Sequence, residues 1–126
     1  MGTTSAKKRV LVVEDNAMNM ELLCQLLEDA DYEPLSAYDG VEGVEMAEAQ
    51  LPDLILMDIS MPRMNGLDAT KVLKSTPATA HIPVIIVTAH ALDSERQRAK
   101  ETGCDGFLTK PVEEEALAEL IETLLS

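Results

Sequence analysis

Three short apolar runs that end at polar side chains constrain the fold of this chain more than any other feature. The runs are Arg9–Val13, Leu54–Met57 and Ile82–Val87, and the residues that follow them are Glu14-Asp15, Asp58 and Thr88. The runs do not alternate between apolar and polar residues, as a strand with one solvated face would, and β-branched residues are frequent in them. Such runs are typical of strands buried on both faces of a parallel sheet. We therefore expect a parallel sheet covered by helices.

Two weaker strands and five helical patterns complete the series. The weaker strands are Glu33–Ala37, where Pro34 suits a sheet edge, and Gly106–Thr109, which ends at Lys110-Pro111. The helical patterns follow Asp15 or Asn16, run from Gly40 to near Leu51-Pro52, run from Gly66 to Thr76-Pro77, and cover Leu92–Thr102 and Val112–Leu125. Alternating strands and helices predict an α/β fold with a doubly wound parallel sheet and right-handed crossovers.

Length and composition exclude several classes of protein. A chain of 126 residues fits one domain, and we expect a single domain over 8–126 after a flexible tail at 1–7. The net charge of −13 argues against direct contact with nucleic acid or with anionic membrane surfaces. Two cysteines, Cys24 and Cys104, form no disulfide framework and fit a reducing compartment. No apolar run is long enough to span a membrane, so we expect a cytoplasmic protein.

Polar residues at the ends of separate strands are expected to meet in one cleft, because the carboxyl ends of parallel strands lie at one edge of a sheet. They are Glu14, Asp15, Asp58, Thr88 and Lys110. Carboxylates that converge repel one another, and a hard divalent cation such as Mg²⁺ would relieve the repulsion. A lysine and a hydroxyl beside them suit the oxygens of a phosphoryl group. Taken singly, each has a simpler interpretation: Asp58 or Thr88 as a helix cap, and Lys110 as a surface lysine.

The chain resembles the receiver domain of two-component response regulators, of the stand-alone or hybrid-kinase type, over roughly residues 8 to 125. The motifs that carry the resemblance are Val12-Val13-Glu14-Asp15-Asn16, Leu56–Gly66, Val87-Thr88-Ala89 and Phe107-Leu108-Thr109-Lys110-Pro111. The resemblance implies a flavodoxin-like (βα)5 fold with the strand order 2-1-3-4-5.

The resemblance also implies a phosphorylation site and a metal site. Asp58 corresponds to the phosphoacceptor, a carboxylate nucleophile that forms an acyl phosphate. Asp15, Asp58 and the backbone carbonyl of Ser60 correspond to ligands of Mg²⁺ or Mn²⁺. Glu14 stands where many relatives have Asp, and its longer side chain favours contact with the metal through a water.

The remaining motif residues correspond to a conformational switch. Lys110 pairs with the phosphoryl group, and the Lys110-Pro111 bond is expected to be cis. The backbone of Ala89 contacts the phosphoryl group. Thr88 and Phe107 correspond to the switch pair, in which the hydroxyl moves toward the phosphoryl group and the ring moves inward.

The implied function is to accept a phosphoryl group from a histidine kinase or histidine phosphotransfer protein and to signal to a downstream protein effector. Catalysis is confined to the protein's own phosphorylation and dephosphorylation. An alternative is a degenerate receiver that binds proteins without phosphorylation. A dehalogenase-like phosphatase is disfavoured, because Ser60 stands where a second Asp is required. A flavodoxin-like electron carrier is disfavoured by the scarcity of aromatic residues, at 2% of the chain.

The first helix offers a candidate surface for the kinase or phosphotransfer protein. We expect Leu22, Leu23, Leu26 and Leu27 to form its buried stripe, with Met18, Met20 and Cys24 outside that stripe. Flexible methionines suit adaptable interfaces, so Met18 and Met20 are predicted to contact a partner. An alternative with equal support is that one of them fills the gap between the helix and the sheet.

Overall fold

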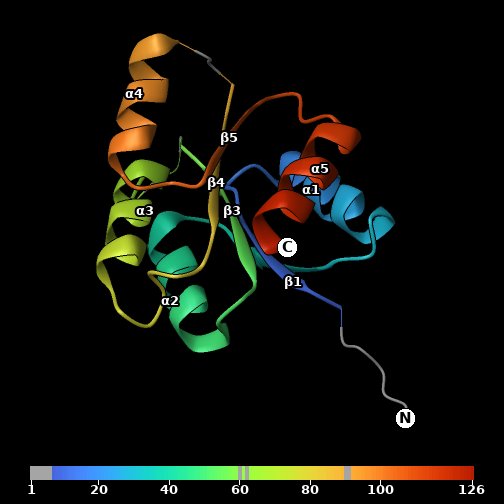
Figure 1. Ribbon diagram of the computed structural model, residues 1–126, viewed down its shortest axis with the longest axis horizontal. Coiled ribbons are helices and arrows are strands. Elements are labelled where there is room, and N and C mark those ends of the chain that lie inside the picture. Colours follow the sequence, from blue (N-terminus) through green and yellow to red (C-terminus); the bar gives the residue numbers. More distant parts are fainter. Residues whose placement is uncertain (1–6, 60, 62, 90–91) are drawn as a thin grey trace.

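Five parallel strands form one sheet in the order β2-β1-β3-β4-β5 (Figure 1). The strands are β1 (Arg9–Val13), β2 (Glu33–Ala37), β3 (Leu54–Asp58), β4 (Val84–Thr88) and β5 (Gly106–Thr109). The computed structural model describes residues 7–59, 61, 63–89 and 92–126. The expected α/β class and the strand order 2-1-3-4-5 are both confirmed.

Five helices cover the two faces of the sheet. They are α1 (Ala17–Asp29), α2 (Gly40–Gln50), α3 (Gly66–Ser75), α4 (Asp93–Glu101) and α5 (Glu114–Leu125). Figure 1 shows α1 and α5 on one face and α2, α3 and α4 on the other. None of the helices in the described part of the chain has the length and hydropathy that crossing a bilayer requires.

Alternate residues of the inner strands enter two separate cores. Leu11 and Val13 of β1 pack with residues of α2 and α3, whereas Val10 and Val12 pack with residues of α1 and α5. Every residue of β3 and β4 is buried. The outer strands differ, since Ala37 is the one buried residue of β2 and no residue of β5 is fully buried. The unbroken apolar runs thus mark the strands that are covered on both faces.

The expected stripe of α1 was wrong at two positions. Met20 is buried, with 4% of its surface exposed, whereas Leu22 is 60% exposed. The buried residues of α1 are Met20, Leu23 and Leu27, a spacing of three and four that keeps them on one helix face. Met20 therefore fills the gap between helix and sheet and is not available to a partner. Met18 is 79% exposed, in agreement with the expectation.

Asparagine and aspartate side chains define the start of three helices. Asn16 caps α1 by accepting a hydrogen bond from the Asn19 amide at 3.0 Å, which decides between Asp15 and Asn16. Asp39 and Asn65 cap α2 and α3 in the same way. Helices α4 and α5 begin without a side-chain cap, and they start one and two residues later than the sequence pattern indicated.

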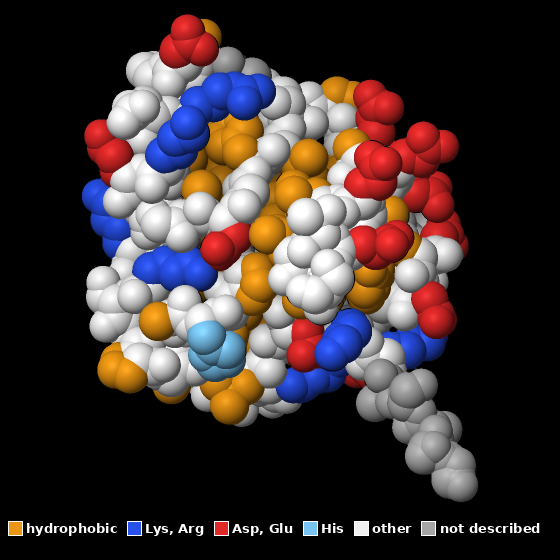
Figure 2. Space-filling view, viewed as in Figure 1, with side chains coloured by type: hydrophobic (Ala, Val, Ile, Leu, Met, Phe, Trp, Pro, Cys, Tyr) orange, Lys and Arg blue, Asp and Glu red, His pale blue; other side chains and the backbone are white. Residues whose placement is uncertain are grey.

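Charge is distributed unevenly over the surface. Figure 2 shows basic side chains over α4 and acidic side chains gathered over the α1 and α5 side of the same view. The exposed basic residues of α4 are Arg96, Arg98 and Lys100, and the exposed acidic residues of α5 are Glu114, Glu115, Glu119 and Glu122. Helix α5 therefore carries only acidic charges, whereas the basic residues of α4 are interspersed with the exposed acidic residues Asp93 and Glu101.

Candidate functional site

The sheet register brings the polar strand ends to one edge. Val13 pairs with Met57, Asp58 with Val87, and Thr88 with Thr109, so β1, β3, β4 and β5 finish side by side. Two backbone bonds continue the ladders beyond the strands: the Glu14 amide donates to Ala37, and the Lys110 amide donates to Thr88 at 2.7 Å. The backbone of the sheet therefore fixes where Glu14 and Lys110 leave it.

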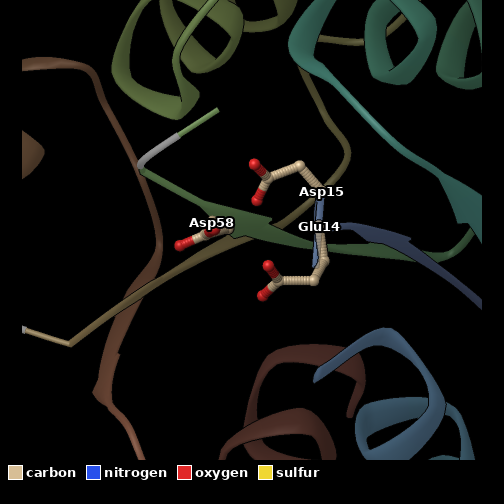
Figure 3. A group of neighbouring side chains, drawn as sticks. All are labelled: Glu14, Asp15 and Asp58. Carbon is tan, nitrogen blue, oxygen red and sulfur yellow. The ribbon is translucent and has the colours of Figure 1, made fainter. Parts of the chain in front are cut away.

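Three carboxylates converge at this edge. Glu14, Asp15 and Asp58 each offer an oxygen, and these oxygens all lie within 4.8 Å of one another. Figure 3 shows the three side chains directed toward one shared space, two from the end of β1 and one from the end of β3. Glu14 is 1% exposed and Asp58 is 6% exposed, whereas Asp15 is open to solvent. Oxygen ligands at such separations suit a hard divalent cation.

A single lysine offsets part of this negative charge. The Lys110 Nζ lies 2.9 Å from Glu14 Oε1 and 3.4 Å from Asp58 Oδ1. The other Glu14 oxygen accepts a hydrogen bond from the Asn16 amide at 3.2 Å. Among the described residues, no hydrogen bond or ion pair engages the Asp15 carboxylate. The Glu14 oxygens and one Asp58 oxygen thus have partners, whereas Asp15 keeps its full acceptor capacity among the described residues.

Burial raises the pKa of the Asp58 carboxyl group. Loss of solvent raises the pKa of Asp58 from 3.8 to about 6; the charge on Glu14 acts in the same direction, and Lys110 opposes both. Burial alone would lower the pKa of the Lys110 ammonium, but Glu14 and Asp58 together hold it above its usual value. At neutral pH Asp58 is therefore ionised, and the single positive charge of Lys110 does not fully offset its burial and the repulsion from Glu14.

The segment after β3 folds back onto the end of that strand. The Gly66 amide donates to the Ile59 carbonyl at 2.9 Å, and a Cβ at Gly66 would overlap the Asp58 carbonyl oxygen. Only glycine permits this approach, so Gly66 helps to position Asp58. Ser60, which the sequence predicted as a metal ligand through its carbonyl, lies outside the described residues.

Both residues of the predicted switch pair contact α4. Thr88 is 4% exposed, and its hydroxyl donates a hydrogen bond to Glu95 Oε1 at 3.1 Å. Phe107 is half-buried, and the Arg96 guanidinium lies 4.9 Å from the centre of its ring. Sequence reasoning missed Glu95 and Arg96, because they lie in a polar helix whose pattern points to no contact.

The structure brings most of the predicted site residues together. Glu14, Asp15, Asp58 and Lys110 form the cluster, and Thr88 lies at the end of the neighbouring strand. Ala89 follows directly and is exposed, and the Lys110-Pro111 bond is cis as expected. A hollow of about 500 Å³ opens beside Asp15, and its lining includes Met61, Glu95 and Arg98. The cleft is thus wide enough for a group from another molecule.

Comparisons with known proteins agree with this arrangement. Residues 10–122 match the model of the response regulator receiver domain. The polar-differentiation response regulator DivK of Brucella anthropi is 41% identical over 119 residues, which are 94% of each chain. The chemotaxis protein CheY4 of Vibrio cholerae is 29% identical with a TM-score of 0.89, over 95% of this chain and 100% of that one.

A third relative comes from a kinase. The receiver domain of a sensor histidine kinase from Pseudomonas aeruginosa, solved with a magnesium ion coordinated in its active site cleft, is 30% identical with a TM-score of 0.89, over 95% of this chain and 98% of that one. Receiver domains are signalling switches that interact with histidine kinases or phosphotransfer proteins and with downstream effectors. The chain belongs to the family of response regulator receiver domains.

Proposed function

We propose that this protein accepts a phosphoryl group on Asp58 from a histidine kinase or histidine phosphotransfer protein, and that the modification switches its conformation. The observation that carries the proposal is the placement of Asp58. It is a buried strand-end carboxylate that lies 3.4 Å from Lys110 and within the same cluster as Asp15, which lines a hollow of about 500 Å³. A nucleophilic carboxylate needs both a cation to receive the incoming oxygens and space for the donor.

The residues of the cluster fit Mg²⁺, and Mn²⁺ has the same preference for oxygen. Asp15 and Asp58 would hold the ion directly, and Glu14, whose oxygens already bind Lys110 and Asn16, would contact it through a water. The Ser60 carbonyl is proposed as a further ligand. When bound, the ion supplies positive charge that neutralises the carboxylates and the phosphoryl oxygens. The related Pseudomonas receiver domain, with magnesium in its cleft, supports this assignment.

The chain's own residues can then transfer the group. A carboxylate oxygen of Asp58 attacks phosphorus and forms a P–O bond, while the P–N bond to the donor histidine breaks and its electron pair remains on the imidazole. Lys110 lies within reach of Asp58 and places its ammonium beside the arriving negative charge. The Ala89 amide and the Thr88 hydroxyl, at the end of the adjacent strand, donate hydrogen bonds to the phosphoryl oxygens. Movement of Thr88, coupled to Phe107, constitutes the switch.

Labelling by a small phosphodonor tests the assignment. With acetyl phosphate and Mg²⁺, the wild type should gain one base-labile phosphoryl group, and it should gain none when the metal is removed by EDTA. Asp58→Asn should abolish labelling, whereas Asp29→Asn, at an exposed carboxylate in the last turn of α1, should leave it unchanged. Full labelling of Asp58→Asn would refute the proposal.

The phosphodonor is proposed to dock on α1. Met18 and Leu22 are 79% and 60% exposed and line one shallow hollow of the surface. Leu22 also lines an apolar groove of about 260 Å³, together with residues that include Leu26, Pro111 and Val112. Lys110 also lines this groove, so a helix seated there would lie next to the phosphorylation site. An apolar helical surface on the donor would complement such a groove.

A charged substitution separates docking from chemistry. Met18→Lys should slow phosphotransfer from the cognate kinase by about tenfold, because one buried contact contributes about 1–2 kcal/mol to binding. Labelling by acetyl phosphate should be unaffected. Val72→Lys, at a partly exposed apolar residue of α3, serves as the control and should affect neither reaction. An equal loss in both assays for Met18→Lys would indicate a folding defect and would reject the docking surface.

A binding module that functions without phosphorylation remains the competing function. It predicts that the effector binds Asp58→Asn as tightly as the phosphorylated wild type. The intact cluster disfavours it, since a module without chemistry has no need to retain three carboxylates that repel one another and a lysine that loses solvent beside them.

Two half-buried free cysteines, Cys24 and Cys104, are consistent with a cytoplasmic location.

A further inference from the structure

Helix α4 is held to the rest of the domain by few buried side chains. Ala99 is the only buried residue among its nine, all of which the structure describes. Its exposed charged residues are of both signs: Arg96, Arg98 and Lys100, together with Asp93 and Glu101. Glu95 differs from these, because it is half-buried and directed toward the end of β4. The individual contacts of α4 therefore matter for its position.

Consecutive residues of α4 contact the two members of the switch pair. Glu95 accepts the hydrogen bond of the Thr88 hydroxyl at 3.1 Å, and the Arg96 guanidinium lies 4.9 Å from the centre of the Phe107 ring. Thr88 and Phe107 belong to different strands, β4 and β5. One turn of α4 thus contacts both residues of the proposed switch, which lie on two neighbouring strands.

The bond to Glu95 competes with the bond that phosphorylation requires. A threonine hydroxyl has a single proton and can donate one hydrogen bond at a time. In this structure the proton is directed to Glu95, a carboxylate and hence a strong acceptor. In the phosphorylated protein the same proton must be donated to a phosphoryl oxygen. The two states therefore exclude each other at this atom.

We infer that Glu95 is a positioning residue that holds Thr88 in the resting state and thereby lowers the affinity of the site for the phosphoryl group. The inference rests on the proposed function and assigns to that site a residue that opposes its activation. A ligand shifts such an equilibrium only by its differential affinity for the two states. Removal of the Glu95 carboxylate should therefore favour the active state before any phosphoryl group arrives.

Binding of beryllofluoride with Mg²⁺ provides the measurement. This anion occupies a phosphoryl site without forming a stable covalent product, and isothermal titration calorimetry reports its dissociation constant. Glu95→Ala should bind it about three- to tenfold more tightly than the wild type, because one competing hydrogen bond has been removed. Glu101→Ala, at an exposed carboxylate in the last position of α4, should bind as the wild type does.

Loss of a negative charge near the cleft could strengthen anion binding without any role for the hydrogen bond. Two further variants distinguish these causes. Glu95→Gln removes the charge but keeps an oxygen that accepts the Thr88 proton, so its gain should be smaller than that of Glu95→Ala. In a Thr88→Val background, which has no hydroxyl, Glu95→Ala should produce no gain.

The outcomes are separable. Failure of the wild type to bind beryllofluoride would refute the proposed function itself. Binding by the wild type with no gain in Glu95→Ala would overturn the positioning role alone, and so would a gain that persists in the Thr88→Val background. Thermal unfolding midpoints within a few degrees of the wild type would verify that each variant is folded.

Discussion

Two lysines bind carboxylates at opposite ends of the parallel strands, with different consequences. We call these the amino edge, where Lys74 lies, and the carboxyl edge, where Lys110 lies. At the amino edge, the Lys74 Nζ lies 2.8 Å from Asp105 Oδ2 and donates to the carbonyls of Ile82 and Ala80. The same Asp105 oxygen accepts the Val84 amide at 2.9 Å. Here one ammonium meets one carboxylate, and the remaining partners are backbone groups, so the charges are balanced.

At the carboxyl edge, the balance fails. Lys110 has two carboxylates within 3.4 Å, and Asp15 adds a third to the cluster. The surplus of negative charge follows from the fold itself, because the register of the sheet brings these strand ends together. A balanced pair can only stabilise the fold, whereas a cluster with surplus negative charge can bind a cation and use it. The comparison therefore separates a structural lysine, Lys74, from Lys110, for which a functional role is proposed.

The largest effect is expected at the amino edge. Lys74→Met should lower the free energy of unfolding by about 2–3 kcal/mol, since it removes an ion pair and leaves two carbonyls without their donor. Urea denaturation measures the change. Lys71→Met, at an exposed lysine of the same helix, should change it by less than about 0.5 kcal/mol. Folded Lys74→Met should still be labelled by acetyl phosphate at the wild-type rate. A loss of labelling would contradict the purely structural role of Lys74.

At the carboxyl edge, removal of a carboxylate should stabilise the protein. Asp58→Asn is expected to raise the free energy of unfolding by about 2 kcal/mol at pH 7.5 without Mg²⁺, because the pKa of about 6 shows that ionised Asp58 is disfavoured in the folded state. Asp105→Asn should have the opposite sign, since Lys74 would lose its charged partner. A destabilised Asp58→Asn would show that Lys110 outweighs the repulsion.

The difference in free energy of unfolding between Asp58→Asn and the wild type should depend on pH. The pKa of Asp58 is higher in the folded protein, about 6, than its ordinary value of 3.8. Its contribution to stability is therefore complete below pH 3.8 and is lost as the pH rises through 6. The stability difference between Asp58→Asn and the wild type should be near zero at low pH and should grow across that window. Urea denaturation of both proteins at several pH values measures it, and a constant difference would disprove the raised pKa.

The sequence predicted the fold well because the constraints on the central strands are local. An unbroken apolar run is sufficient to identify β3 and β4, whose residues are all buried, and the convergence of Glu14, Asp15, Asp58 and Lys110 then follows from parallel topology. The face of α1 was less certain, because leucine and methionine are both apolar and packing decides between Met20 and Leu22.

Contacts between distant polar residues could not be predicted in this way. The pair of Lys74 with Asp105 and the bond from Thr88 to Glu95 depend on how α3 and α4 are seated on the sheet. No periodicity in the sequence encodes that seating. Sequence patterns thus identify which residues reach a sheet edge, whereas three-dimensional packing determines which helix residues meet them.

Mg²⁺ should stabilise the folded protein by binding at the carboxyl edge and not at the amino edge. At ten times its dissociation constant, Mg²⁺ should stabilise the wild type by about 1.4 kcal/mol, provided that it binds only the folded chain. Asp15→Asn should gain much less, because it lacks one proposed ligand. Lys74→Met should gain as much as the wild type does. Thermal unfolding with and without Mg²⁺ measures all three, and an equal gain in Asp15→Asn would place the ion elsewhere.

The smallest effect concerns screening by salt. Raising KCl from 0.05 to 0.5 M shortens the distance over which charges interact, so it should relieve part of the repulsion around Asp58. The gap in stability between Asp58→Asn and the wild type should then narrow by about 0.3–0.5 kcal/mol without Mg²⁺. The change is small because desolvation, the larger cause of the raised pKa of Asp58, does not depend on salt.

The gap in stability between Lys74→Met and the wild type should narrow as well. In this case screening weakens the attraction between Lys74 and Asp105, whereas at Asp58 it weakens a repulsion. The two edges are distinguished by sign: salt should stabilise the wild type relative to Asp58→Asn and destabilise it relative to Lys74→Met. Shifts of the same sign in both comparisons would show that the charge surplus is not confined to the carboxyl edge.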